Sequence, residues 1–207
     1  CRFTWQQQQR LLKAVWNEFQ RHRVDTQIWI FDHNFRDSMR FPARILADPE
    51  SRDMVDGVAF HSYEGRSVEM TKLHKAFPNQ HIYFTERSTW GARGIDEILC
   101  YFRNWAESYN AWVTCLDDQQ QPNAGPHSCS PTFVMVNRHD PDDYAYIPEY
   151  WLLGQISKFV RHGAHRREAA LDGVAEGLDD DGRLRLRSAA GIQTVTAGEV
   201  VRVATGR

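Results

Sequence analysis

The chain has 207 residues and a formal net charge of -2; 42% of its residues are hydrophobic and 25% are charged. These values are typical of a globular protein with one large domain, or with one domain and a small appendage. No basic run of five or more residues is present, which argues against a nucleic-acid partner because phosphate binding needs clustered Lys and Arg. No apolar run approaches the roughly 18 residues of a membrane span, so we expect none.

Hydrophobic spacing and apolar runs predict the secondary structure. In chain order, the expected elements are a helix over 5–20, a strand over 26–31, helical or irregular sequence to about residue 54, a strand over 57–63, a helix over 67–76, a strand over 81–85, a helix over 95–109, a strand over 111–116, a short strand over 133–136 and a helix over 149–160. The four longer strands are almost continuously apolar. Strands of this kind are buried on both faces, which predicts a parallel sheet covered by helices.

The composition changes after Gly163. Aromatic residues vanish, and Gly, Ala, Asp and Arg dominate the remaining sequence, with short alternating runs such as Leu184-Arg185-Leu186. We therefore divide the chain into an α/β domain over residues 1–162 and an antiparallel β appendage over residues 163–207.

The four cysteines are Cys1, Cys100, Cys115 and Cys129. They form no CxxC pair and no zinc spacing, so we expect neither a metal site nor a cofactor. The apolar neighbours of Cys100 and Cys115 predict buried thiols, and a Cys115–Cys129 disulfide stays open. The sequence shows no signal peptide. The chain starts with Cys1 inside an apparent helix, and we expect an N-terminal part of the protein to precede it.

Polar residues cluster at the carboxyl ends of the predicted strands. They are Asp32-His33-Asn34, His61-Ser62-Tyr63, Glu86 and Asp117-Asp118-Gln119. In parallel α/β folds this end of the sheet carries the chemistry. One such residue on its own is usually structural, but donors and carboxylates at four successive strand ends predict a functional site.

Glu86 is the central residue of this pattern. An ionised carboxylate at the end of a buried strand is costly unless another group pairs with it or uses it. One interpretation is a structural ion pair with Arg87. The other is a catalytic carboxylate, favoured by His61 and Tyr63, which are two residues apart and so point to the same side of a strand, and by Asp32 at the same edge.

Several segments strongly resemble glycoside hydrolase family 30, which includes glucosylceramidases and endo-β-1,6-glucanases. The resemblance extends from about residue 10 to residue 166, in order, through "IFDHN", "VAFHSYEG", "LHKAFPNQHIYFTERS", "WVTCLDD" and "YIPEYWLLGQISKFVRHGAHR". It implies the C-terminal half of a (β/α)8 TIM barrel, about strands five to eight, followed by a small β-domain. The tail "LDDDGRLRLRSAAG" departs from the family, so we expect that β-domain to be incomplete or altered.

The resemblance implies that Glu86 is the catalytic nucleophile at the end of strand seven. A retaining β-glycosidase needs a second carboxylate about 5 to 5.5 Å away as acid and base. We expect His61 and Tyr63 to hydrogen-bond the nucleophile and the sugar, and Asp32 with His33 to lie within reach of the sugar. The seven Trp and seven Tyr suggest either packing or sugar stacking. Trp90 and Trp112 are candidates for a stacking platform, and Asp117 and Asp118 for the rim or for solvated loop charges.

The family places the acid/base in an Asn-Glu pair after strand four. Asn17-Glu18 has that sequence, but it lies inside the predicted helix between Trp16 and Phe19, so we reject it. Glu64 is read as a loop residue. We therefore expect the acid/base on a missing N-terminal half-barrel, and this chain alone to be inactive.

Two other interpretations stay open. One is a non-catalytic, sugar-binding remnant, since half a barrel exposes strand edges and an open core face. The other is a metal-dependent barrel hydrolase with Asp32, His33, His61 and Glu86 as ligands, although no HxH or HExxH pair supports it. The resemblance leaves open whether the substrate is a glucosylceramide-like lipid or a β-1,6-glucan, and only family membership suggests a secreted, lysosomal or periplasmic location.

Overall fold

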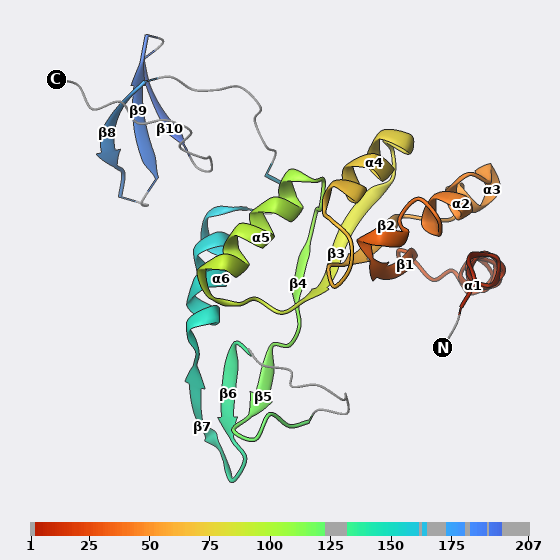
Figure 1. Ribbon diagram of the computed structural model, residues 1–207, viewed down its shortest axis with the longest axis horizontal. Helices are drawn as coiled ribbons and strands as arrows, with labels where there is room; N and C mark the ends of the chain where they lie inside the picture. The colour runs from red at the N-terminus through yellow and green to blue at the C-terminus, as the bar shows by residue number, and fades with distance from the viewer. Residues whose placement is uncertain are drawn as a thin grey trace. The chain divides into compact units, whose positions relative to one another are not determined.

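A computed structural model describes residues 3–122, 132–161, 163–164, 173–180, 183–189 and 191–195 of the chain. Its helices are α1 (Trp5–His22), the 3-10 turn η1 (Phe35–Asp37), α2 (Pro42–Leu46), α3 (Pro49–Asp53), α4 (Val68–Ala76), α5 (Gly91–Arg103) and α6 (Pro148–Phe159) (Figure 1). Its strands are β1 (Trp29–Asn34), β2 (Gly57–His61), β3 (His81–Arg87), β4 (Tyr109–Ala111), β5 (Cys115–Asp117), β6 (Val134–Asn137), β7 (Asp140–Tyr146), β8 (Val174–Leu178), β9 (Leu184–Ser188) and β10 (Gly191–Val195).

The chain forms two compact units, residues 1–150 and 151–207. The division falls inside α6, whereas the sequence placed a domain boundary after residue 162, and that boundary stays a prediction. The larger unit contains a four-stranded sheet in the order β1-β2-β3-β4, with every neighbouring pair parallel. Sequential parallel strands joined by helices are the α/β pattern that the apolar runs predicted.

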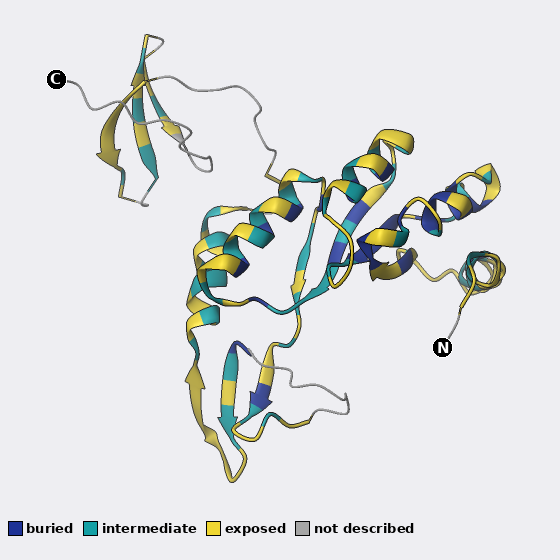
Figure 2. Ribbon diagram, viewed as in Figure 1, coloured by how far each residue is buried: buried dark blue, intermediate teal, exposed yellow. Residues whose placement is uncertain are grey.

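One face of this sheet is buried beneath helices. Ile30, Val58 and Ile82 lie at the same level on three neighbouring strands, and all three are almost fully buried. Further along, Phe84 stacks on Tyr101 of α5 with ring centroids 4.0 Å apart. The same core includes Met70 and Leu73 of α4, Leu12 of α1 and Phe35 of η1. Figure 2 shows the buried residues concentrated on β2, β3 and the helix turns that face them.

The opposite face begins with a stack of two large rings. Trp29 and Tyr83 stack at 3.9 Å, although they belong to strands on either side of β2. A Cβ on Gly57 would lie only 2.4 Å from the Tyr83 ring, so the absence of a side chain at Gly57 gives that ring its place. Trp29 is 41% exposed, so this face is more open than the helix-covered one.

The structure corrects the predicted strand over 111–116. The segment divides into the end of β4 and into β5, which belong to different sheets. β5 pairs in parallel with β6, and β6 pairs with β7 in an antiparallel hairpin. The sequence did not predict β7, whose residues are exposed along the whole strand.

The cysteine prediction was wrong. Cys100 and Cys115 are both exposed, free thiols. Cys100 lies on the outward side of α5, where it contacts the hydroxyl of Ser67 at 3.1 Å. Cys1 and Cys129 lie outside the described residues.

Within the smaller unit, β8, β9 and β10 form a three-stranded antiparallel sheet. All described residues of β8 are exposed, as Figure 2 shows. The expectation that this β-domain is incomplete or altered stays a prediction, because much of residues 165–207 lies outside the described ranges.

Candidate active site

Three polar residues share one level at the carboxyl ends of β1, β2 and β3. Asn34 is paired in register with His61, and His61 with Glu86. Phe60 is buried under the helices, and successive residues of a strand point to opposite faces, so His61 projects from the uncovered face. The register thus brings together residues that lie in three separate segments of the sequence.

Two β-bulges adjust the side chains just before this level. The pairing of β1 with β2 skips Asp32, and the pairing of β2 with β3 skips Thr85. Phe31 and Asp32 have φ of 80° and 53°, which non-glycine residues seldom adopt. Bulges redirect side chains and occur often beside active sites, and strained backbone is also concentrated there.

The imidazole of His61 lies between two carboxylates. Its Nε2 is 3.0 Å from Asp32 Oδ1, and its Nδ1 is 3.7 Å from Glu86 Oε1. The His61 side chain is only 13% exposed, against 25% for Glu86 and 66% for Asp32. An ionised carboxylate only accepts hydrogen bonds, so His61 Nε2–H donates to Asp32 and the other ring nitrogen faces Glu86.

Asp32 is held in its charged form. The hydrogen bond from His61 is the largest cause that lowers its pKa below the usual value; the Thr85 hydrogen bond and the charges of His61 and His33 act in the same direction. Partial burial opposes them. Thr85 Oγ1 donates to Asp32 Oδ1 at 2.7 Å, so a single carboxylate oxygen receives both bonds.

Tyr63 lies beyond the end of β2, not on the strand as predicted. Its backbone N–H donates to Oδ1 of the buried Asn34 at 3.0 Å. Its ring stands edge-on to His61, with centroids 6.2 Å apart, and Arg87 Cζ lies 5.4 Å from the ring centroid. Tyr63 therefore belongs to the cluster through its backbone and through two contacts of its ring.

Arg87 is directed away from Glu86. Neighbouring strand residues point to opposite faces. The Arg87 guanidinium accordingly approaches Glu97 of α5, with Nε 3.7 Å from Oε2. Within the described residues no ion pair joins Arg87 to Glu86, so the interpretation of Glu86 as half of a structural pair with Arg87 is wrong.

The two predicted stacking residues both follow the cluster residues in the sequence. Trp90 is the N-cap residue of α5 and is 53% exposed. Trp112 is 45% exposed, and its backbone N–H donates to the carbonyl of Arg87 at 2.9 Å. Both rings are accessible, and their role as a sugar platform stays a prediction.

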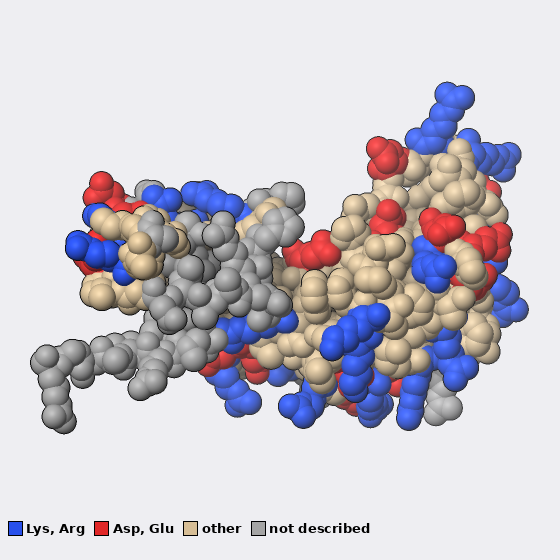
Figure 3. Space-filling model, turned by 90° about the horizontal axis from the view of Figure 1, so that it is seen from above, with Lys and Arg blue, Asp and Glu red and all other residues tan. Residues whose placement is uncertain are grey.

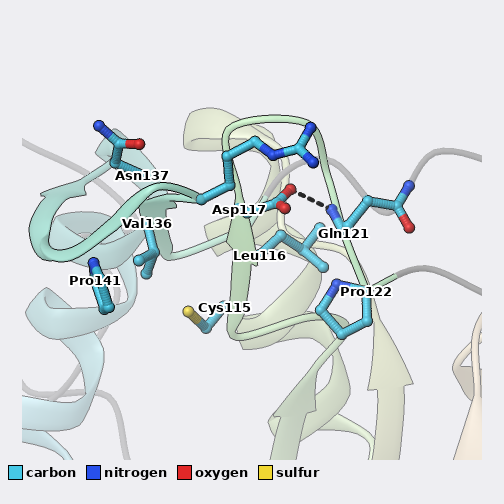
Figure 4. Close-up of a pocket in the computed structure, with 9 residues that line it drawn as sticks. Cys115, Leu116, Asp117, Gln121, Pro122, Val136, Asn137 and Pro141 are labelled. Carbon is cyan, nitrogen blue, oxygen red and sulfur yellow. Dashed lines mark hydrogen bonds between the residues drawn. The ribbon is translucent and has the colours of Figure 1, made fainter.

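Asp117 lies on β5, in a different sheet from Glu86. Its Oδ1 accepts the backbone N–H of Gln119 at 2.9 Å and that of Gln121 at 2.6 Å, and so closes its own loop. It also borders a cavity of about 510 Å³ (Figure 4). Asp118 Oδ1 likewise accepts a backbone N–H, that of Arg138. The contacts seen here are those of turn residues.

The other carboxylates have ordinary surface partners. Glu18 lies within α1 and is 3.3 Å from His22 and 3.8 Å from Arg21. Glu64 pairs with Arg36 at 2.8 Å. Across the described residues, no three His, Cys, Asp or Glu side chains are grouped to hold a metal ion.

The sequence assigned no role to Asn34, Thr85 or Glu97. Asn34 was one of the polar strand-end residues but received no individual role, and Thr85 was marked only by its position beside Glu86. Glu97 is separated from Arg87 by the start of α5, and only helix packing brings it close.

Curated proteins of similar sequence include a glucanase and a glucosylceramidase. The endo-1,6-β-D-glucanase neg1 of Aspergillus fumigatus is 28% identical over 148 residues, covering 68% of this chain. Putative glucosylceramidase 4 of Caenorhabditis elegans is 27% identical over 143 residues, covering 61% of it. The chain spans 29% and 27% of the length of these two proteins.

These similarities support an assignment of the chain to glycoside hydrolase family 30. Solved structures agree in fold. The endo-β1,6-glucanase BT3312 has a TM-score of 0.66 at 20% identity, covering 95% of this chain and 42% of its own. Xylanase C of family 30 from Talaromyces cellulolyticus has a TM-score of 0.56 at 12% identity, covering 92% and 43%. The chain has a mixed α/β fold that is compatible with part of a TIM barrel plus a β-domain, as in these structural neighbours.

The smaller unit has a separate likeness. A family model described as "Biotin protein ligase C terminal domain" matches residues 166–203. The described part of this range forms the β8–β10 sheet. The match lies outside the family 30 cluster around Glu86.

The described surface has two further features. None of its helices combines the length and the apolar character needed to cross a membrane. On the face drawn in Figure 3, basic and acidic side chains both occur, and a broad area of the larger unit carries no charged side chain.

Proposed function

We propose that this chain carries the nucleophile half of the active site of a retaining β-glycosidase, with Glu86 as the nucleophile. The observation that carries the proposal is the placement of Glu86 Oε1 3.7 Å from His61 Nδ1 at the carboxyl end of a parallel strand. The similarity to family 30 and the glucanase and glucosylceramidase names of the relatives support a β-glucoside as substrate.

The reaction proceeds in two displacements. An oxygen of Glu86 attacks the anomeric carbon while the bond from that carbon to the leaving oxygen breaks, and a general acid protonates the leaving group. Water, deprotonated by the same acid/base residue, then attacks the anomeric carbon and releases Glu86. His61 faces the carboxylate that attacks, and Asp32 holds the imidazole in place through Nε2.

The acid/base residue belongs to the part of the barrel outside this chain. Glu18 lies within α1 beside Arg21 and His22, and Glu64, although it follows Tyr63, is paired with Arg36. The chain corresponds to about strands five to eight of the barrel, and the isolated chain is inactive toward ordinary β-glucosides.

A substrate whose leaving group needs no protonation by a general acid can test whether Glu86 acts as a nucleophile in this chain alone. The probe is 2,4-dinitrophenyl 2-deoxy-2-fluoro-β-glucoside, whose phenolate leaves without protonation and whose fluorine slows hydrolysis of the ester. Attack by Glu86 forms a glycosyl ester and releases dinitrophenolate. Peptide mass spectrometry should locate the sugar on Glu86 in the wild-type chain, and Glu86→Gln should carry none.

Activity is tested in a longer protein that includes the upstream half-barrel. It should hydrolyse an aryl β-glucoside, and Glu86→Gln should abolish that hydrolysis. Parallel assays with β-1,6-glucan and with glucosylceramide in detergent distinguish the two substrate classes. Undiminished hydrolysis by Glu86→Gln would refute the nucleophile assignment, and sugar binding without any hydrolysis would favour the non-catalytic interpretation.

A further inference from the structure

The partly buried position of the Arg87 side chain is not explained by its hydrogen bonds. Its Nε is buried and, within the described residues, has no hydrogen-bond acceptor; the nearest carboxylate oxygen, Glu97 Oε2, is 3.7 Å away. A buried donor without an acceptor costs free energy, so such a group needs another explanation. The guanidinium lies over Tyr63, a member of the Glu86 cluster, and this contact suggests an explanation.

The Arg87 guanidinium covers the ring of Tyr63. Its Cζ lies 5.4 Å from the ring centroid, within the range of a cation–π contact. The edge-on contact with His61 and the backbone bond to Asn34 hold the same tyrosine from other directions. Because Tyr63 lies beyond β2 and is 47% exposed, no strand pairing fixes its ring.

We propose that Arg87 is a positioning residue that holds the Tyr63 ring beside His61 and that Glu97 aligns the guanidinium for this contact. This inference rests on the proposed function, because the phenol held in this way offers its hydroxyl to the sugar or to the nucleophile. Arg87 acts through Tyr63 and does not itself touch the reacting atoms.

Arg93 provides a matched control. Its Nε lies 3.7 Å from Glu97 Oε1, so Arg93 and Arg87 share one carboxylate at equal distances. The Arg93 side chain is 88% exposed. Arg93→Met therefore removes a cation from Glu97, as Arg87→Met does, but leaves the cation over Tyr63 in place.

The first test observes the Tyr63 ring directly. Ring ¹³C–¹H resonances of the 207-residue chain are recorded with labelled tyrosine, and the Tyr63 signal is identified by its loss in Tyr63→Phe. Arg87→Met should shift that signal, Arg87→Lys should restore part of the shift, and Arg93→Met should leave it in place. An unchanged signal in Arg87→Met, or an equal shift in Arg93→Met, would overturn the proposal.

The second test links the ring to the reaction. Arg87→Met should slow labelling of Glu86 by the fluoroglucoside roughly threefold to tenfold, in keeping with the strength of a cation–π contact. Arg93→Met should match the wild-type rate, and Arg87→Lys should recover part of it. Equal rates in wild type and Arg87→Met would refute the role of Arg87. If the wild-type chain takes up no label, the proposed function fails, and the Tyr63 resonance alone decides whether Arg87 holds the ring.

Discussion

The hydroxyl of Thr85 donates to Asp32 Oδ1 at 2.7 Å, across the end of the strand that separates them. Both residues are the extra residues of β-bulges, left out of the pairing of their own strands. The bond therefore joins the two irregularities of the sheet, directly beneath the level of His61 and Glu86. The geometry of the site depends on two residues that regular strand pairing would have directed elsewhere.

Replacing Thr85 by Val removes this bond with little change in shape. We expect Thr85→Val to lower the free energy of unfolding by about 0.5 to 1.5 kcal/mol, because a charged but largely exposed carboxylate loses this donor. Urea denaturation at pH 7 measures the loss. The loss should shrink at low pH, where Asp32 is protonated.

Thr71→Val is the matched control for that measurement. Thr71 donates to the neutral amide oxygen of Asn104 at 2.8 Å, well away from the bulges. Its loss should cost about 0.5 to 1.5 kcal/mol, with no change between pH 4 and pH 7. A loss in Thr85→Val that is equally insensitive to pH would contradict the link to Asp32.

Asp32 should make stability depend on acidity. Its pKa in the folded chain lies below the usual value, chiefly because of the His61 hydrogen bond. A carboxylate with a lowered pKa stabilises the fold above its unfolded pKa of about 3.9, and this contribution disappears as the pH falls through the folded pKa. Asp32→Asn should thus be less stable than wild type at pH 5 to 7, and the two should converge below about pH 4. Since Asp32 is largely exposed, the difference should stay within about 1 kcal/mol.

Two glycines should respond to alanine in opposite directions. A Cβ on Gly57 would lie 2.4 Å from Tyr83 Cε2 and 3.1 Å from the carbonyl of His81. Gly57→Ala must therefore push Tyr83 off Trp29 or move the strands, at a cost of about 1 to 3 kcal/mol. Thermal unfolding should show a lower midpoint, and the near-ultraviolet circular dichroism of the ring pair should change.

Gly154 supplies the comparison. It lies within α6, and a Cβ there would meet no atom within 4 Å. Gly154→Ala should raise helix stability by about 0.5 to 1 kcal/mol because glycine loses more backbone entropy on folding. If both variants lower the midpoint of thermal unfolding equally, the close approach of Tyr83 does not explain why glycine is needed at position 57.

Sequence patterns predicted the helices and parallel strands because both have a regular spacing of apolar residues. They placed α1, α4, β2 and β3 close to their observed bounds. The spacing of apolar residues gave a wrong prediction where it could not show which strands pair with each other. The apolar run 111–116 looked continuous, but its two halves pair with different sheets.

The strand β7 was missed for a related reason. Its sequence "DPDDYAY" is acidic and exposed along its length, so no alternation marks it, and only pairing with β6 defines it as a strand. The candidate site was likewise predicted only where a local sequence pattern marked its residues. Asp32, His61 and Glu86 were predicted because they end apolar runs, whereas the bulges at Asp32 and Thr85 depend on register, which a single strand does not reveal.

We expect the ionisation of Tyr109 to be the main cause of the loss of folding stability at high pH. Its ring packs flat against Phe84 at 5.5 Å, its hydroxyl donates to the carbonyl of Arg87 at 3.1 Å, and the hydroxyl of Thr89 lies 2.6 Å away. Burial raises the pKa of Tyr109 from 10.0 to about 12. A raised folded pKa means that its contribution is complete below about pH 10 and is lost as the pH rises through about 12.

Tyrosinate absorbance at 295 nm should therefore show a late step near pH 12 in the folded chain, and Tyr109→Phe should lack that step. The same variant loses two hydrogen bonds, so it should be less stable than wild type at pH 7 by about 1 to 2 kcal/mol. Between pH 10 and 12 its stability should decline less steeply, because the group whose ionisation opposes burial is gone. A late step that persists in Tyr109→Phe would assign it instead to Tyr101, whose pKa burial also raises.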